Sequence, residues 1–487
     1  MALQAYGIAE FKTGKKMTTD SLFCTCSTTK AFTATALSLA IDESQKAGGS
    51  LNWDTPIASL LGDEFVLADD YATLNTTLED ALSHRSGLPG HAYAMLLASP
   101  NEALQTEVQK LRYLPLAYAP RTTFDYCNHM YMVISRVLEK ITGEDLGKVL
   151  KRRFWKPLGM DDTYFSVREV LDCPKTRSQL VQGYSWLPGT KEYAIEPYTI
   201  EYAPTTGTGA IVSNVLDYSK WLRALIYEEG PVSSDNYGEL FRPRTIISSR
   251  DNIIAPPGIH LYALGWFVDN YRGYQLFWHS GSWVGFGIMV GFVPSIEFGF
   301  VMMANTQEAR NAELELYLYL IDKVLGFSGA GRAEHVARMI QRMQLESVKQ
   351  ESTGEAMKRL FPCLPEPPIP HAVPLDRYIA TYEHGGYGSM ILELKDGRLH
   401  ADLMDRVCKA CIKFEHASGE FFVGEPYIPG RNGARAEFFR VEFYIDSTGT
   451  PQMMGVELEP ALRGEKIWFQ RRPKSRFIPK TVENHSC

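Results

Sequence analysis

A proline-rich run most constrains what this chain can fold into. Five of the nine residues from Pro362 to Pro370 are proline. Proline lacks a backbone N–H and fixes its own φ, so the run supports neither a helix nor an inner strand. Such density is typical of a semi-rigid linker. Because 487 residues also exceed a typical single domain, we expect a folded part on each side of the run.

The first part mixes helical and strand signals. Residues 31–41 are small and apolar with helical character, and Thr76 with Glu79 three residues later has the pattern of a capping box that starts another helix. Residues 287–293 and 298–303 form two apolar segments separated by a short turn. These two segments are predicted to be strands.

The second part has the pattern of an antiparallel β domain. Asp396-Gly397 separates two alternating segments, and Asp-Gly accepts the positive φ angles of a hairpin turn. Several such short strands with regular turns indicate a small barrel of about 100 residues. The predicted boundaries are 1–330 for the first domain, 331–374 for a charged helix and the linker, and 375–475 for the barrel.

Composition excludes several classes of partner and location. The net charge is −7 without a basic cluster, so a nucleic-acid partner is not expected. The apolar runs are too short to span a bilayer, and the first residues lack the pattern of a signal peptide. Eight cysteines in so long a chain do not form a disulfide framework. We therefore expect a cytoplasmic protein without a membrane span.

Three short motifs carry the chemistry. They are S-T-T-K at residues 27–30, Y-C-N at residues 126–128 and H-S-G at residues 279–281. A helical run follows Ser27 at once, which places its hydroxyl near a helix N-terminus, where the backbone N–H groups and the dipole favour negative charge. Lys30 lies one turn later on the same face. Each motif is common by chance, but their order and separation together favour an acyl-enzyme site.

The second motif supplies a phenol and an amide. A buried lysine loses its proton readily, so Lys30 can serve as a base or hold the neighbouring Tyr126 phenol ionised. The amide of Asn128 can hold a substrate carbonyl or bridge to Lys30. Taken singly, Ser27 would more often be a helix cap, Lys30 a solvated cation and Tyr126 a half-buried aromatic side chain.

The segments around these motifs extend the pattern. Residues 21–37 resemble the nucleophile region of the serine β-lactamase and penicillin-binding-protein superfamily, and residues 82–88, 157–163 and 207–221 also match it. The resemblance is greatest to the class C branch, the S12 peptidase family of esterases, D-aminopeptidases and acyltransferases. It implies an α+β fold: a β-lactamase/transpeptidase-like antiparallel sheet flanked by helices, a mainly helical lobe, and the site between them.

The resemblance also implies a role for each motif residue. Ser27 is the nucleophile, and Lys30 and Tyr126 share general-base and general-acid work. The oxyanion hole consists of the backbone N–H groups of Ser27 and Ser282, worth about 10²–10³ in rate for each donor. The residues expected to bind substrate are Asn128, His279, Ser280 and Gly281.

The chain departs from the family pattern in two places. Histidine replaces the usual lysine at position 279, which makes the second positive charge of the site depend on pH and favours substrates without a carboxylate. The chain also begins almost on the Gly7-Ile8-Ala9 segment, before which relatives carry a helix and a strand. We therefore expect that the natural product is longer, or that another segment covers the strand edge left open.

The remaining features point to no metal or cofactor. The C-terminal barrel resembles a lipocalin-like domain, either covering the mouth of the site or serving only stability. Cys408 and Cys411 have zinc-knuckle spacing without a second pair of ligands, and Cys24 and Cys26 alternate along a strand. All four are interpreted as core or edge thiols.

These observations predict a metal-free serine hydrolase or acyltransferase that acts through a Ser27 acyl-enzyme. The substrate is expected to be a small-molecule ester, amide or thioester, with biosynthetic acyl transfer among the candidates. The alternatives are a D-amino-acid amidase or peptidase and, in another class, a catalytically silent binding scaffold. Intact Ser27, Lys30 and Tyr126 argue against the scaffold. Whether the chain forms a homo-oligomer stays open.

Overall fold

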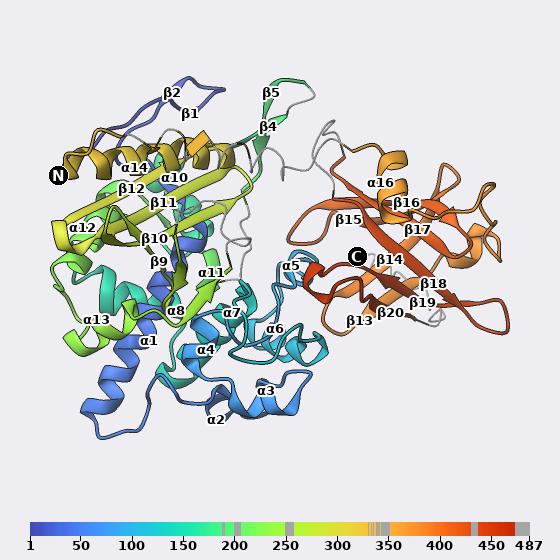
Figure 1. The fold of residues 1–487 in the computed structure, drawn as a ribbon, viewed down its shortest axis with the longest axis horizontal. Coiled ribbons are helices and arrows are strands. Elements are labelled where there is room, and N and C mark those ends of the chain that lie inside the picture. Colours follow the sequence, from blue (N-terminus) through green and yellow to red (C-terminus); the bar gives the residue numbers. More distant parts are fainter. Residues whose placement is uncertain are drawn as a thin grey trace, which may run out of the picture. The chain divides into compact units, whose positions relative to one another are not determined.

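The computed structural model separates the chain into two units (Figure 1). One unit contains residues 1–95 and 99–349, and the other contains residues 96–98 and 350–487. The residues that the structure describes are 1–187, 190–198, 206–248, 258–329, 331–332, 334, 336–337, 341, 351–429 and 437–472.

A six-stranded antiparallel sheet organises the first unit, with its strands in sequence order from β7 at one edge to β12 at the other. Every residue of β11 is buried, as expected for a continuous apolar strand covered on both faces. A short turn with Glu297 in the left-handed region joins β11 to β12, so the two predicted strands are confirmed. The strands are β7 (Thr245–Ile247), β8 (His260–Tyr262), β9 (Phe267–Tyr271), β10 (Tyr274–Trp283), β11 (Phe286–Val293) and β12 (Phe298–Ala304).

Helices pack on both faces of this sheet (Figure 1). On one face, α14 (Arg310–Leu325) packs Leu314, Tyr317 and Leu318 against side chains such as Trp278. On the other face lie α1 (Thr29–Lys46) and α12 (Val215–Ile226). Between them Phe32 stacks on Trp221 with ring centroids 3.8 Å apart. The predicted helix at 31–41 is thus confirmed, and it lies in the core.

Shorter elements complete the first unit and include the mainly helical lobe. The helices are α2 (Ile57–Leu61), α3 (Asp70–Asn75), α4 (Leu78–Leu82), α5 (Ala92–Leu96), α6 (Leu104–Lys110), α7 (Asn128–Thr142), α8 (Leu146–Leu150), α9 (Val167–Asp172), α10 (Pro174–Gln179), α11 (Thr206–Gly209) and α13 (Ser234–Phe241). The short strands are β1 (Ile8–Glu10), β2 (Lys15–Lys16), β3 (Phe23–Cys24), β4 (Gly183–Leu187), β5 (Glu192–Glu196) and β6 (Val212–Ser213).

Two local predictions are corrected. The capping box at the start of α4 uses Thr77 and Asp80, one residue later than predicted, because Thr76 ends the preceding helix. Strand β1 does not join the six-stranded sheet. It pairs with β2 instead, and the Ala9 carbonyl accepts a hydrogen bond from the Gln182 amide. The strand at Gly7-Ile8-Ala9, for which an open edge was expected, therefore has β2 as its neighbour.

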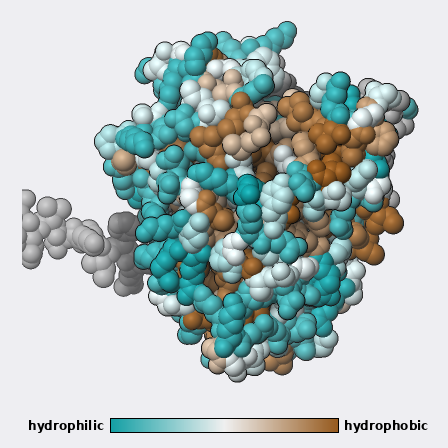
Figure 2. Space-filling model, turned by 90° about the vertical axis from the view of Figure 1, so that its left-hand side faces the viewer, coloured by the Kyte–Doolittle hydropathy of each residue, from teal (hydrophilic) through white to brown (hydrophobic). Residues whose placement is uncertain are grey.

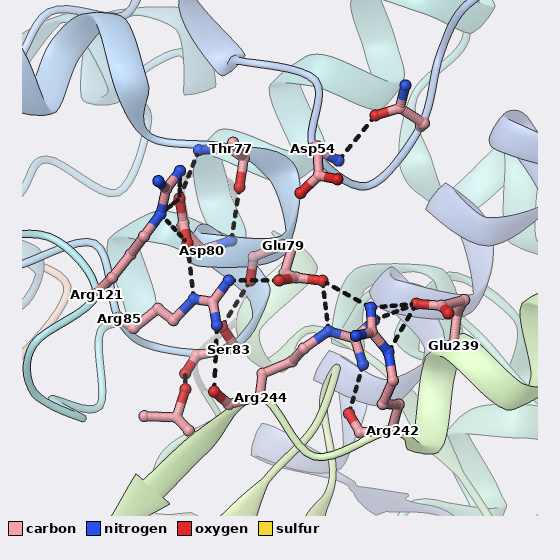
Figure 3. Close-up of polar contacts among 12 residues, drawn as sticks. Asp54, Thr77, Glu79, Asp80, Ser83, Arg85, Arg121, Glu239, Arg242 and Arg244 are labelled. Atoms are coloured by element: carbon pink, nitrogen blue, oxygen red, sulfur yellow. Dashed lines mark hydrogen bonds and ion pairs between the residues drawn. The ribbon is translucent and has the colours of Figure 1, made fainter.

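A network of ion pairs links α4 to the region around α13 and β7 (Figure 3). Asp80 binds Arg85 at 2.7 Å and Arg121 at 2.8 Å, and its carboxylate is fully buried. Neighbouring Glu79 pairs with Arg85 and with the buried side chain of Arg244. Paired buried charges resist separation, because breaking one pair leaves the other charge uncompensated. The network therefore fixes the turn that follows α4.

The second unit contains a closed antiparallel barrel. It closes where Tyr382 of β13 pairs with Arg471 of β20. Asp396 and Gly397 have φ angles of 49° and 74°, as the predicted hairpin turn requires. The eight-stranded barrel confirms the predicted architecture of this part. Its strands are β13 (Thr381–His384), β14 (Gly388–Lys395), β15 (Arg398–Leu403), β16 (Ala410–Ser418), β17 (Phe421–Tyr427), β18 (Phe439–Ile445), β19 (Pro451–Val456) and β20 (Ile467–Arg471).

Three further segments belong to the barrel unit. Helix α16 (Thr353–Leu360) packs Ala356 and Leu360 against Val423 of the barrel. In the proline-rich run, the Ile369 amide donates to the Ser418 hydroxyl at 3.0 Å. Residues 96–98 also lie here, because the Leu96 and Ala98 carbonyls accept hydrogen bonds from the backbone amides of Cys408 and Val407. A charged helix was predicted over 333–360. Most of its part before residue 351 lies outside the described residues.

The surface of the molecule is chemically mixed. Hydrophilic residues predominate on the face shown in Figure 2, and hydrophobic residues gather toward its upper right. Among the helices that the structure describes, none is both long enough and apolar enough to cross a bilayer.

Candidate active site

Ser27 lies at the turn where β3 leads into α1. Residues Cys26–Thr28 form the 3₁₀ helix η1, and α1 continues it from Thr29. Cys26 takes a left-handed φ of 53°, which makes the turn sharp. Ser27 itself is only half-buried, unlike its neighbours. The predicted position of Ser27 at a helix N-terminus is therefore what the structure shows.

Lys30 lies one turn further along and reaches back to the serine. Its Nζ donates to the Ser27 hydroxyl at 3.3 Å and to the Thr208 carbonyl of α11 at 3.1 Å. The side chain is fully buried, and no carboxylate is among these partners. Burial lowers the pKa of the Lys30 ammonium well below its ordinary value. The group is thereby prepared to act as a neutral amine.

Tyr126 faces the same serine from the segment before α7. Its ring centroid lies 4.8 Å from the Lys30 Nζ, and its phenol lies close to the Ser27 side chain. Burial raises the pKa of the phenol well above its ordinary value, although the nearby Ser27 hydroxyl and the charge of Arg310 act in the opposite direction. The resting phenol is therefore protonated, and the Ser27 hydroxyl lies between an amine and a phenol.

His84 fixes the segment that carries Tyr126. It follows α4 with a left-handed φ of 58° and is buried. Its carbonyl accepts from the Asp125 amide at 2.9 Å, and its Nδ1 accepts from the Cys127 amide at 3.0 Å. The imidazole also lies against the Tyr126 ring, with centroids 4.3 Å apart. The His84 side chain thus holds the backbone and the ring of this segment together.

Asn128 is the first residue of α7 and lines the cavity beside Ser27. Its side-chain oxygen is buried and has no hydrogen-bond partner among the residues that the structure describes. Its backbone carbonyl accepts from the Thr208 hydroxyl at 2.9 Å. Since a buried amide oxygen without a partner is unfavourable, this atom is available to a donor N–H of a bound molecule.

The third motif lies on β10, where the strand extends past its neighbour. Strand β9 pairs only with residues 274–278, so the part of β10 that carries residues 279–283 is free of β9 and approaches η1. At Gly281 a Cβ atom would lie 2.3 Å from the Thr25 carbonyl oxygen. Glycine at this position lets the strand lie directly against the nucleophile turn. Ser282, whose backbone N–H is the predicted second oxyanion donor, lines the cavity with Ser27.

His279 is not among the residues that line the cavity, although its ring lies near that of Tyr126, with centroids 6.3 Å apart. It is 1% exposed, its Nδ1 donates to the Ser280 carbonyl at 2.7 Å, and its Nε2 accepts from the Tyr262 hydroxyl at 3.0 Å. Burial lowers the pKa of the imidazole to about 3, and the nearby Lys30 acts in the same direction. His279 is therefore neutral at neutral pH, and its expected pH-dependent positive charge is not available there.

The cavity beside Ser27 has a volume of about 310 Å³. Its polar groups lie near the serine and at the rim, where α9 contributes Arg168 and Glu169. A cavity of this size with largely apolar walls is typical of a site for a small-molecule ligand. The apolar and aromatic residues that line it are Met95, Phe165, Val167, Pro197, Tyr198, Ala210, Trp283, Val284 and Phe286.

Arg310 is a charged residue near the site that the motifs do not reveal. It opens α14, and its Nη2 donates to the Ser280 hydroxyl at 3.4 Å. Its Nε is buried and has no hydrogen-bond partner in the described part of the chain. The carboxylate of Glu313, one turn later, is buried and equally without a partner, and burial raises its pKa to about 8.

Sequence signals existed for some of these additional residues. His84 and Thr208 fall within segments 82–88 and 207–221, which already resemble the family, but no role could be given to them. Arg310 follows the last sheet strand and matches none of the motifs. Its place near Ser280 depends on how α14 packs on the sheet.

Comparison with known proteins shows which family the chain resembles over its length. Residues 1–322 match the β-lactamase family, and residues 364–471 match a domain of unknown function, DUF3471. The unguisins hydrolase ungD′ of Aspergillus campestris is 35% identical over 484 residues, which cover 97% of this chain and 87% of that protein. The unguisins hydrolase ungD of Aspergillus violaceofuscus is 33% identical over 492 residues, covering 96% and 85%.

Solved structures show the same fold at low identity. An octameric penicillin-binding protein homologue from Pyrococcus abyssi has a TM-score of 0.55 at 19% identity, covering 95% of this chain and 92% of that one. The hydrolase EstCE1 has a TM-score of 0.51 at 19% identity, covering 62% and 85%. The family match over the first 322 residues and the full-length relatives confirm the family that the motifs indicated. This chain belongs to the β-lactamase family of hydrolases.

Proposed function

We propose that this chain hydrolyses an amide or ester bond of a small molecule through an acyl-enzyme on Ser27. One observation carries the proposal: the Lys30 amine hydrogen-bonds the Ser27 hydroxyl at the wall of the cavity, and the Tyr126 phenol lies close to the same hydroxyl. A serine hydroxyl is a weak nucleophile until a neighbouring base accepts its proton. Here Lys30, as the base, and Tyr126, as the acid, lie on either side of the Ser27 hydroxyl.

The acylation step follows from the protonation states. The neutral Lys30 amine accepts the Ser27 proton as the serine oxygen bonds to the substrate carbonyl carbon. The carbonyl oxygen gains negative charge, which the backbone N–H groups of Ser27 and Ser282 are placed to stabilise. Tyr126 then gives its phenol proton to the leaving nitrogen or oxygen as the scissile bond breaks, and it recovers a proton from the Lys30 ammonium.

In deacylation, a water molecule is the nucleophile and Ser27 is the leaving group. A water molecule replaces the leaving group and loses a proton to the Tyr126–Lys30 pair as its oxygen attacks the acyl carbon. The bond from the acyl carbon to the Ser27 oxygen then breaks, and the serine regains its proton. The product is a carboxylic acid, and the pair returns to its starting protonation state.

The substrate class is suggested by the relatives and the cavity together. Two full-length relatives are named unguisins hydrolases, so we propose unguisins as the first candidate substrates. The apolar walls fit an apolar side chain next to the scissile carbonyl. Since His279 is neutral, the site has no cation at that position to select a carboxylate. The free Asn128 oxygen is placed to accept a substrate amide N–H.

The test combines covalent labelling with turnover. A fluorophosphonate probe should add one adduct mass to the protein at Ser27, and the protein should hydrolyse unguisins as followed by mass spectrometry. Ser27→Ala should lose both, while Ser50→Ala, at an exposed loop serine, should keep both. Labelling without unguisin turnover would reject the substrate but keep the chemistry. Ser27→Ala with full turnover of p-nitrophenyl acetate would reject the mechanism.

A further inference from the structure

The site contains cations of two kinds, which differ in whether they keep their charge. Lys30 and His279 are both buried, and burial lowers the pKa of each, for His279 to about 3. Burial therefore disfavours the positive charge of both groups, and His279 is neutral near pH 7. A guanidinium does not lose its proton in this range. Among the buried cations that the structure describes near Ser27, Arg310 thus keeps its positive charge.

The sheet leaves room for this side chain. At Gly287 of β11 a Cβ atom would lie 3.1 Å from the Arg310 Cγ, so glycine there admits the side chain against the strand. Gly287 pairs with Ser282 of β10, whose backbone N–H is assigned to the oxyanion hole. From this position the guanidinium reaches the Ser280 hydroxyl. Arg310 therefore lies across β10 from the nucleophile turn, close to the third motif.

In the described part of the chain the Arg310 guanidinium forms no ion pair, and its hydrogen bond goes to the uncharged Ser280 hydroxyl. Its Nε is buried with no hydrogen bond among the described residues, and Glu313 is the nearest carboxylate on the same helix. Burial raises the pKa of Glu313 to about 8, so this carboxyl group is protonated near pH 7 and does not neutralise the guanidinium. An uncompensated buried charge is costly for folding. The cost is recovered if negative charge develops nearby during the reaction.

We propose that Arg310 is an electrostatic positioning residue, whose guanidinium supplies across strand β10 the fixed positive charge that position 279 lacks. It acts on the Tyr126 phenol and on the oxyanion without touching the substrate. The inference deepens the proposed function and rests on it. Its charge favours the deprotonated form of Tyr126, which the phenol must reach when it protonates the leaving group.

The charged and titratable groups that surround this position come from several elements. They are Arg310 and Glu313 of α14, His279 of β10, Cys26 of η1, Lys30 of α1, Tyr126 before α7, and His84 after α4. Burial raises the pKa of the Cys26 thiol and lowers that of the His84 imidazole, so both are neutral near pH 7.

The test removes the charge and then restores it. Arg310→Met should lower kcat/KM for p-nitrophenyl acetate by about tenfold to a hundredfold, and should remove the loss of activity above pH about 8, because no guanidinium is left for an ionised Glu313 to cancel. Arg310→Lys should recover most of both effects, because it keeps the charge while losing the fork geometry. Arg272→Met is the matched control, since Arg272 pairs with Asp322 of α14 away from the site.

Several outcomes would overturn the inference. One is an Arg310→Met variant with unchanged kcat/KM and pH profile; another is an Arg310→Lys variant as impaired as Arg310→Met, which would show that shape matters and charge does not. If Arg310→Met does not fold, Glu313→Gln decides: it should remove a loss of activity above pH about 8, where an ionised Glu313 would cancel the guanidinium. An unchanged alkaline limb in Glu313→Gln would count against the proposal. Wild-type protein that resists the fluorophosphonate probe would instead reject the proposed function.

Discussion

The backbone amide of Cys127 donates a hydrogen bond to Nδ1 of His84 at 3.0 Å, and this bond fixes the segment that carries Tyr126. The same imidazole lies against the Tyr126 ring, so one side chain sets both the backbone and the ring position of the phenol. Burial and the charge of Lys30 lower the pKa of His84 well below its ordinary value. The imidazole is therefore neutral and can accept the hydrogen bond throughout the neutral range.

The first prediction concerns this contact. His84→Leu should reduce kcat by about a hundredfold with a smaller change in KM, because it removes the imidazole that accepts from the Cys127 amide and lets Tyr126 move away from Ser27. His84→Asn, whose side-chain oxygen can accept the same bond, should lose less. Steady-state kinetics with an activated ester measures both. Equal kcat values for wild type and His84→Leu would show that Tyr126 is held by other contacts.

The second prediction concerns the glycine of the third motif. Gly281→Ala places a Cβ atom against the Thr25 carbonyl, so β10 must move away from the nucleophile turn. We expect a loss of about 1–3 kcal/mol in the free energy of unfolding and loss of fluorophosphonate labelling. Gly238→Ala in α13 is the control, since a Cβ atom there meets nothing within 4 Å and should be neutral or stabilising. A labelled, stable Gly281→Ala variant would disprove the close approach.

The third prediction concerns the ion pairs of Figure 3. Asp80→Asn should destabilise the protein by about 3–5 kcal/mol, because Arg85 and Arg121 lose a buried partner. Burial raises the pKa of Asp80, but hydrogen bonds from Arg121, Thr77 and Arg85 lower it overall. The stabilisation by Asp80 is thus fully present above the pKa of its carboxyl in the unfolded state. It is lost as pH falls through the pKa of the carboxyl in the folded state. Glu229→Gln, in an exposed pair with Arg223, should change denaturant unfolding by less than about 1 kcal/mol.

The fourth prediction concerns acid stability. Burial lowers the pKa of His129 to about 4, while an unfolded histidine titrates near 6.5. Between these values the unfolded state binds a proton that the folded state does not, so stability falls as pH drops, by at most about 1.4 kcal/mol per pH unit for this group. His129→Gln should flatten that part of the profile of unfolding free energy against pH. An unchanged slope between pH 6.5 and 4 would mean that His129 is protonated in the folded state.

Local patterns predicted much of the fold and of the candidate site. The Asp396-Gly397 turn and the apolar strands around residues 294–297 depend on neighbouring residues, so the sequence was sufficient for them. The spacing of Ser27 and Lys30 follows from one helical turn, and the structure shows the contact. The choice between Thr76 and Thr77 as helix cap failed because adjacent threonines have the same preference.

Tertiary burial determined what the sequence did not predict. The expected switch of His279 near neutral pH assumed an exposed imidazole, but β8 provides Tyr262 as its partner and excludes water. Arg310 lies 31 positions after His279 in the chain, and only the packing of α14 on the sheet brings it to Ser280. A short motif predicts neither the burial of a side chain nor the packing of a distant helix.

The path of the chain through the two units has a consequence for dissecting the protein. Residues 96–98 belong to the barrel unit although they lie within the first hundred positions, and α16 belongs to it as well. A stop codon after Leu360 would therefore leave two carbonyl groups, those of Leu96 and Ala98, without the amides that cover them. It would also expose the apolar side of α16 to water. Separate expression of the two units thus needs a redesigned loop at residues 96–98 in addition to a new terminus before α16.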